Sequence, residues 1–225
     1  MKRNAKKSLS LGLLFLALFA LWTLLILNVD VRLAGESETP VGFAALNCRF
    51  HAMTGVHMGL YTATDWLGLI PVAVCLLFAV LGAGQLIGRK RLRNGDIDIR
   101  LLGGYYIIVL LAYLLCERFP VNYRPILMDG RVEASYPSST TLMVLTVMPT
   151  LSFQAERRIC DPAAAKLISV ISGIFSIAMV LARTLAGVHW LTDIVGAVLL
   201  SCGLFWIYKG AVLLRDHRSK SMGGR

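Results

Sequence analysis

The sequence predicts an all-α, polytopic membrane helix bundle, and three observations support this fold class. Hydrophobic residues make up 56% of the 225 residues and charged residues 16%, whereas soluble domains average about 25% charged residues. The apolar residues are gathered into runs of the length that crosses a bilayer. Lys and Arg residues are concentrated in every second connection between these runs. The length suits a single domain over residues 1–225.

The apolar runs predict six transmembrane helices. In chain order they extend from about Leu11 to Leu27, Trp66 to Ile87, Leu101 to Cys116, Pro137 to Phe153, Leu167 to Ala186 and Trp190 to Leu214. The first run follows a basic segment, as a signal peptide does, but it is long and no small-residue cleavage site follows closely, so we expect an uncleaved helix. We expect Pro137 to occupy the first helical position of the fourth helix and Pro149 to bend that helix.

The placement of positive charge predicts the orientation. Most of the 23 Lys and Arg residues lie on the side that holds both termini and the segments 89–100 and 156–166. Positive charge collects on the cytoplasmic side of membrane proteins, so we expect both termini to be cytoplasmic. The net charge of +10 is then a signal of topology, and nucleic-acid binding is not needed to explain it. The outer side keeps only Arg32, Arg49, Arg118, Arg124, Arg131 and Arg183.

Polar residues gather at helix ends on this outer face. Arg118 and Arg124 follow the third run, Arg183 ends the fifth, and His189 and Asp193 lead into the sixth. Each has an ordinary explanation, because arginines at helix ends reach toward water and a carboxylate in a first turn is favoured by the helix dipole. Their concentration on one face, where an unpaired arginine is costly, instead indicates a functional site.

The stretch SYPSSTT, residues 135–141, opens the fourth run on the same face. Helix N-terminal amides and guanidinium groups are the usual receptors for phosphate. His189 and Asp193 are four residues apart, so the carboxylate can hold the imidazole and leave its other nitrogen free to attack. The sequence therefore predicts a phosphate site with a histidine nucleophile, open to the outside and beside lipid.

These residues resemble the motifs of the PAP2 superfamily, which includes the type 2 phosphatidic acid phosphatases and the vanadium haloperoxidases. The family's third motif is SR, five residues, H, three residues and D. Here ARTLAGVHWLTD supplies Arg183, His189 and Asp193 at that spacing, with Ala182 in place of the serine. The resemblance covers about residues 117–196 and implies a PAP2-like core.

The family's other two motifs are altered in this chain. The first, a lysine separated by six residues from RP, ends at Arg124-Pro125, but its lysine position is Glu117, with Arg118 one place later. The second, PSGH, aligns with residues 137–140, so Thr140 takes the place of the histidine. That histidine is the family's general acid, and a threonine hydroxyl ionises too weakly to replace it near neutral pH.

The resemblance implies a role for each matching residue. His189 attacks phosphorus and forms a phosphohistidine, and Asp193 orients it. The implied phosphate-binding residues are Arg118, Arg124, Ser138, Ser139, Thr140 and Arg183. The family mechanism uses no cofactor and no metal. The five cysteines form no CxxC pair, so we expect free, inert thiols.

The missing acid leaves three interpretations. In the first, the protein is a phosphatase of phosphatidic acid, phosphatidylglycerophosphate or a polyprenyl diphosphate. The phosphate leaving group of a diphosphate needs little protonation, and alternatively Asp129 or Glu133 supplies the proton. In the second, the protein binds lipid phosphate as a sensor, carrier or partner without turnover. The third covers unrelated membrane proteins, including a small transporter of an anionic solute, but the chain lacks the inverted repeats typical of transporters.

Overall fold

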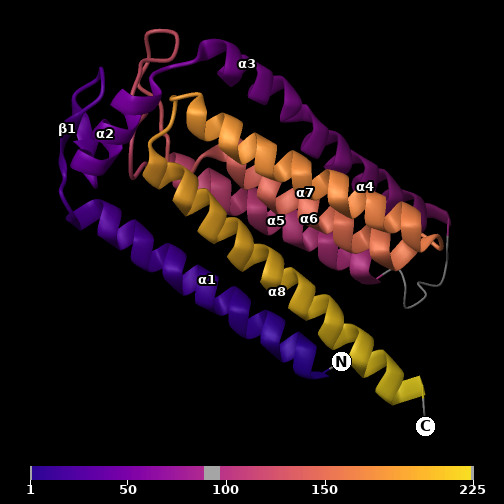
Figure 1. The fold of residues 1–225 in the computed structure, drawn as a ribbon. Helices are drawn as coiled ribbons and strands as arrows, with labels where there is room; N and C mark the ends of the chain where they lie inside the picture. The colour runs from indigo at the N-terminus through magenta and orange to yellow at the C-terminus, as the bar shows by residue number, and fades with distance from the viewer. Residues whose placement is uncertain (1, 89–96, 224–225) are drawn as a thin grey trace.

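The computed structural model describes residues 2–88 and 97–223 as a bundle of long helices, with shorter elements gathered at one end (Figure 1). The all-α prediction is confirmed, apart from one small antiparallel hairpin. The predicted topology signals at 89–96 lie outside the described residues. The elements are α1 (Lys2–Asn28), β1 (Arg32–Ala34), β2 (Thr39–Val41), α2 (Ala44–Thr54), α3 (Met58–Leu67), α4 (Leu69–Gly88), α5 (Ile97–Arg118), α6 (Ser139–Arg158), α7 (Pro162–Leu185) and α8 (Leu191–Gly223).

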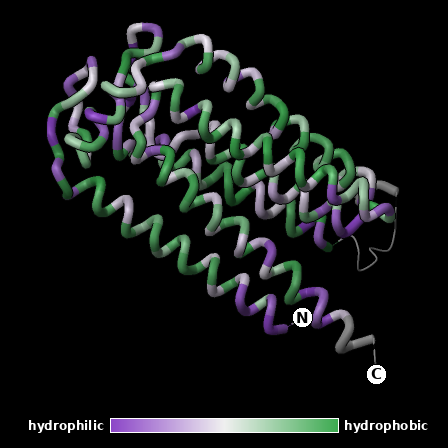
Figure 2. Tube along the Cα trace, viewed as in Figure 1, coloured by the Kyte–Doolittle hydropathy of each residue, from purple (hydrophilic) through white to green (hydrophobic). Residues whose placement is uncertain are grey.

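Within the described residues, five helical segments are long and apolar enough to cross a membrane: α1, α3 continued by α4, α5, α7 and α8. Figure 2 shows hydrophobic residues along the middle of these helices and hydrophilic residues gathered at the two ends of the bundle. Large hydrophobic side chains such as Leu13, Leu76 and Ile174 are exposed on the helix surfaces. The chain is therefore an integral, multi-pass membrane protein.

The fourth predicted span, α6, differs from the others because it is polar. Its buried side chains include Thr146, Thr150 and Gln154, and it does not qualify as an apolar span. The helix packs against α4, α5, α7 and α8, so its polar residues face protein. It runs the length of the bundle, since Arg157 near its end pairs with Asp98 at the start of α5, with 3.0 Å between Nη2 and Oδ2. The prediction of six apolar spans thus holds for five.

The entry into α6 corrects the predicted helix start. Ser138 is the N-cap and Ser139 the first helical residue, whereas Pro137 precedes the helix after a cis peptide bond. The Ser138 amide donates to the carbonyl of Asp193 at 3.3 Å. The chain is therefore tied to the start of α8 before it becomes helical, which keeps Pro137 outside the helix. Pro149 lies inside α6, and the bend expected there stays a prediction.

The most extensive helix–helix contact joins α1 to α8 (Figure 1). Glycines allow this close approach: a Cβ added at Gly12 would lie 2.8 Å from the Ile207 amide nitrogen, and one at Gly203 would lie 2.7 Å from Leu16 Cδ2. Small residues let membrane helices pack with their backbones close together. This contact fixes α8, whose first turn carries part of the site described below.

We expect Gly12→Ala to destabilise the protein, because the added methyl group meets the α8 backbone. Overpacking of this kind costs about 1–3 kcal/mol. The matched control is Gly173→Ala, where no atom lies within 4 Å of the added Cβ and alanine is favoured over glycine in a helix by about 1 kcal/mol. Thermal unfolding in detergent should give a lower Tm for Gly12→Ala and an equal or higher Tm for Gly173→Ala. Equal Tm values for the two variants would contradict the tight contact.

Candidate active site

The segment between α5 and α6 folds back on itself and holds Arg124 at the end of the bundle. The Arg124 amide donates to the Glu133 carbonyl at 3.0 Å, and the Ser135 amide donates to the Asn122 carbonyl at 2.9 Å. This pairing places the Glu133 carboxylate beside the guanidinium, with Oε2 3.0 Å from Arg124 Nε. The Arg124 side chain is buried while that of Glu133 is 46% exposed.

A glycine makes the sharp turn between α7 and α8. Gly187 has φ of 72°, and a Cβ there would collide with the Gly55 backbone, so only glycine fits. Two histidines, one in α2 and one just before α3, hold this turn from outside. His51 Nε2 lies 3.0 Å from the Gly187 carbonyl, and the His57 amide donates to the Ala186 carbonyl at 3.0 Å.

His189 follows this turn and is 5% exposed. Its Nδ1 lies 3.1 Å from the Ser135 carbonyl, which can only accept, so Nδ1 carries the proton and donates. The lone pair is then on Nε2, which lies 3.5 Å from Arg124 Nη1. The ring thus has a fixed tautomer, with its free nitrogen directed at a guanidinium.

Asp193 holds the backbone beside His189 more closely than it holds the ring. Its Oδ2 lies 3.9 Å from His189 Nδ1, beyond hydrogen-bond distance. The same oxygen accepts from the Trp190 amide at 2.9 Å, and Oδ1 accepts from Asn122 Nδ2 at 3.1 Å. The predicted direct hydrogen bond is therefore replaced by the one to Ser135, and the sequence reading missed both Ser135 and Asn122 as partners. The orienting role of Asp193 stays a prediction.

Arg183 extends from the end of α7 toward α3 and is 2% exposed. Its Nη1 donates to Thr64 Oγ1 at 3.0 Å, and its guanidinium carbon lies 4.5 Å from the centre of the Tyr61 ring. Asp65 Oδ1 is 3.9 Å from Nη2. The sequence prediction begins the second apolar run at Trp66 and so leaves these partners out. The signal for them is the polar residues of YTATD just before that run.

A polar chamber of about 220 Å³ lies where these segments meet. It brings together three of the predicted site residues, Arg124, Ser139 and His189. The other side chains that define its chemistry are Tyr113, Glu117, Glu133, Ser135 and Tyr136.

The other predicted site residues lie around the chamber. Ser138 and Asp193 are fully buried. Thr140 lines an adjoining groove of about 440 Å³, which shares Tyr113 and Ser139 with the chamber. Arg118 is exposed, with its guanidinium 5.5 Å from the Phe119 ring, and does not line the chamber. The phosphate-binding roles of these residues stay predictions.

The fold and the site together define a class: a multi-pass membrane protein with a buried histidine and two buried arginines at one end of its helix bundle. The chain belongs to the PAP2 superfamily, whose sequence pattern matches residues 103–215. The resemblance seen in the motifs is thereby confirmed.

Two relatives extend the comparison over most of the chain. The chain is 22% identical over 200 residues to phosphatidylglycerophosphatase B of Bacillus subtilis (strain 168). The aligned region covers 86% of this chain and 92% of the relative. Its fold is similar to the crystal structure of a transmembrane PAP2-type phosphatidylglycerolphosphate phosphatase from Bacillus subtilis, with a TM-score of 0.54 and 18% identity. That match covers 89% of this chain and 95% of the other.

The surroundings of His189 keep the ring neutral. Burial lowers its pKa well below the ordinary value, and the positive charges of Arg124 and Arg183 lower it further. Because the unfolded chain then binds a proton more readily than the folded protein, the neutral ring favours the folded state above about pH 6.5 and this advantage is lost as the pH falls. Each unit of pKa shift corresponds to about 1.4 kcal/mol.

We therefore expect part of the stability loss in acid to depend on His189. Between pH 7.5 and pH 5, the Tm of the wild type in detergent should fall further than that of His189→Asn, which has no group to titrate at this position. His57→Asn, at an exposed loop position, is the control and should follow the wild type. Parallel curves for the wild type and His189→Asn would contradict the lowered pKa.

Proposed function

We propose that this protein is a membrane phosphatase that hydrolyses lipid phosphates through a phosphohistidine on His189. One observation carries the proposal: the hydrogen bond to Ser135 leaves Nε2 with the lone pair, facing Arg124 in the polar chamber. A neutral imidazole held in this way is an activated nucleophile. The name of the Bacillus subtilis relative, a phosphatidylglycerophosphatase, supports the same class of reaction.

The reaction proceeds in two displacements. Nε2 attacks phosphorus, a P–N bond forms, and the bond from phosphorus to the leaving oxygen breaks. Arg124 Nη1 donates to the phosphate oxygens, and so does Arg183, whose Nε has no hydrogen-bond partner among the described residues. Water then attacks phosphorus, the P–N bond breaks, and inorganic phosphate leaves as the imidazole recovers its lone pair. Hydrogen-bond donors that are already in position stabilise the charge that develops on the phosphate.

Glu133 is the candidate proton carrier of the chamber. Its carboxyl group lines the chamber, whereas Asp129, the other candidate, does not. In this scheme a leaving group that needs no proton departs in the first step, and the Glu133 carboxylate, which is paired with Arg124, takes a proton from the attacking water in the second. A lipid diphosphate needs less of this help, because its leaving group is itself a phosphate. Among the lipid phosphates considered, a polyprenyl diphosphate therefore depends least on proton transfer, and phosphatidic acid and phosphatidylglycerophosphate depend on it more.

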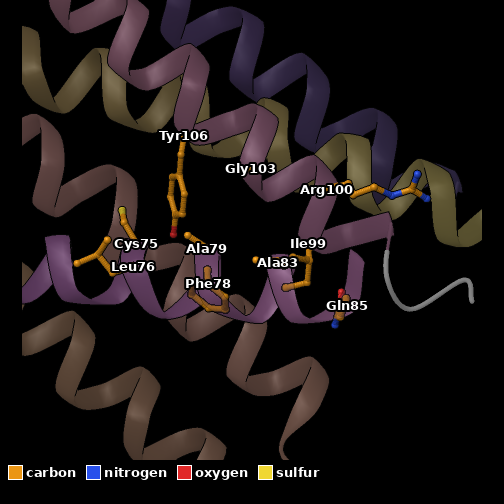
Figure 3. Close-up of a pocket in the computed structure, with 11 residues that line it drawn as sticks. Cys75, Leu76, Phe78, Ala79, Ala83, Gln85, Ile99, Arg100, Gly103 and Tyr106 are labelled. Carbon is orange, nitrogen blue, oxygen red and sulfur yellow. The ribbon is translucent and has the colours of Figure 1, made fainter. Parts of the chain in front are cut away.

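Apolar cavities beside the chamber support a lipid substrate. The groove that adjoins the chamber is lined by apolar side chains of α5 and α6, including Val109, Leu142 and Val147. A second cavity of about 500 Å³ between α4 and α5 shares Cys75 and Tyr106 with this groove. Figure 3 shows this second cavity, with Tyr106 and Ile99 extending from α5 and Cys75 from α4. A lipid whose phosphate lies in the chamber has room for its chain along this path.

The proposal includes six membrane crossings with both termini cytoplasmic. Ser139, at the start of α6, lines the chamber, and Arg157 near its end reaches the start of α5. The helix therefore extends alongside the apolar spans, and as the sixth crossing it needs no apolar surface because its neighbours cover it. The chamber then lies at the extracytoplasmic face.

Phosphate release tests the proposed reaction. Protein purified in detergent should release phosphate from undecaprenyl diphosphate, phosphatidic acid or phosphatidylglycerophosphate, with the diphosphate fastest. His189→Ala should release none, because it lacks the nucleophile. Release from none of the three lipids, or equal release by His189→Ala, would exclude the phosphatase and leave a protein that binds lipid phosphate without turnover.

A Thr140→His substitution tests whether an acid is the missing part. General acid catalysis contributes about 10²–10⁴-fold, so we expect activity on phosphatidic acid to rise within that range while activity on the diphosphate changes less. Met143→His, one turn along the same groove, is the control and should not raise activity. No gain from Thr140→His would indicate that the altered groups around Glu117 also limit monoester hydrolysis.

A further inference from the structure

The charges of the chamber do not match a simple phosphate. Its walls carry two carboxylates, Glu117 and Glu133, and one guanidinium, Arg124. Arg124 already has Glu133 at 3.0 Å from its Nε, and His189 adds no positive charge because its ring is neutral. Arg183 contributes from beside the chamber, but its Nη2 faces Asp65. A dianionic phosphate therefore enters a space in which like charge faces it.

Glu117 is the carboxylate that this arrangement leaves without a cation. No ion pair within the described parts of the chain involves Glu117, and its neighbour Arg118 lies over the Phe119 ring instead. Glu117 lies one turn after Tyr113 on α5, and both side chains line the chamber. A carboxylate next to an aromatic ring is the pairing that binds organic ammonium groups in proteins.

We propose that the chamber selects a phosphate headgroup that also carries a positively charged amine, with Glu117 and Tyr113 holding the ammonium while Arg124 and His189 meet the phosphate. This inference rests on the proposed function, because it adds a headgroup preference to the lipid phosphates proposed for the same site. The amine restores the charge balance that the two carboxylates disturb.

A divalent cation bound to the phosphate is the other way to balance the carboxylates, and the residues favour it less. The described part of the chain contains no group of three His, Cys, Asp or Glu side chains placed to hold a metal ion. Hard cations such as Mg²⁺ and Ca²⁺ take six or more oxygen ligands, whereas one carboxylate and one ring suffice for an ammonium. The Tyr113 ring contributes to binding an ammonium and nothing to binding a hard cation.

The test compares two lipids that differ only in the charge of the amine: sphinganine 1-phosphate, with a free ammonium two carbons from the phosphate oxygen, and its N-acetyl derivative. We expect the wild type to prefer the free amine by roughly tenfold in kcat/KM, the factor expected for one charge-assisted contact. Glu117→Gln should bring the ratio close to one by slowing the free amine alone, and Glu117→Lys should reverse it. Glu38→Gln, at an exposed position of the hairpin outside the chamber, should keep the wild-type ratio.

A binding measurement separates this proposal from the proposed phosphatase function. Tryptophan fluorescence reports the binding of both lipids to His189→Ala. Preferential binding of the free amine without phosphate release by the wild type supports the ammonium site and excludes the phosphatase. Equal kcat/KM or equal binding of the two lipids overturns the ammonium site while leaving the phosphatase intact. A preference for the free amine that persists in Glu117→Gln also overturns the ammonium site. A preference that EDTA abolishes and Mg²⁺ restores also overturns it, in favour of a metal-bound phosphate.

Discussion

The hydrogen bond between His189 Nδ1 and the Ser135 carbonyl is the contact on which the site depends. It joins the turn before α8 to the segment before α6, and it decides which ring nitrogen keeps its lone pair. The carbonyl is fixed in turn, because the Ser135 amide pairs with the Asn122 carbonyl. A backbone acceptor cannot be protonated, so the tautomer stays the same over a wide range of pH. The geometry of the nucleophile is therefore a property of the chain path.

Beneath this contact lies a layer of buried polar side chains that are hydrogen-bonded to one another. Asp193 accepts from Asn122 and from the Trp190 amide, and Asn47 donates to Thr192 Oγ1 at 2.9 Å. An unsatisfied polar group at this depth costs about 1–3 kcal/mol. The network therefore favours one arrangement of the segments around the site relative to the helix bundle. Asp193 contributes to the site by completing this layer, which explains why it is fully buried while its contact with the imidazole is long.

Lipid and protein impose opposite demands on the helices. The outer helices present apolar surfaces, whereas α6 is enclosed by four other helices and carries threonines and a glutamine. Because backbone and hydroxyl groups are satisfied inside the bundle, a central helix can be polar without cost. Its N-terminus supplies Ser139 to the chamber, so this enclosed helix begins within one of the two altered family motifs.

Local patterns in the sequence determined the membrane class, the positions of the apolar helices, the family and the residues Arg124, Arg183 and His189. Hydropathy and motif spacing are properties of neighbouring residues, so the chain reveals them directly. Tertiary structure decided the partners of these residues. Ser135 meets His189 across 54 positions of sequence and Thr64 meets Arg183 across 119, and packing also placed Arg118 outside the chamber. Such contacts depend on how distant helices are set against each other, and no periodicity within a single helix encodes that arrangement.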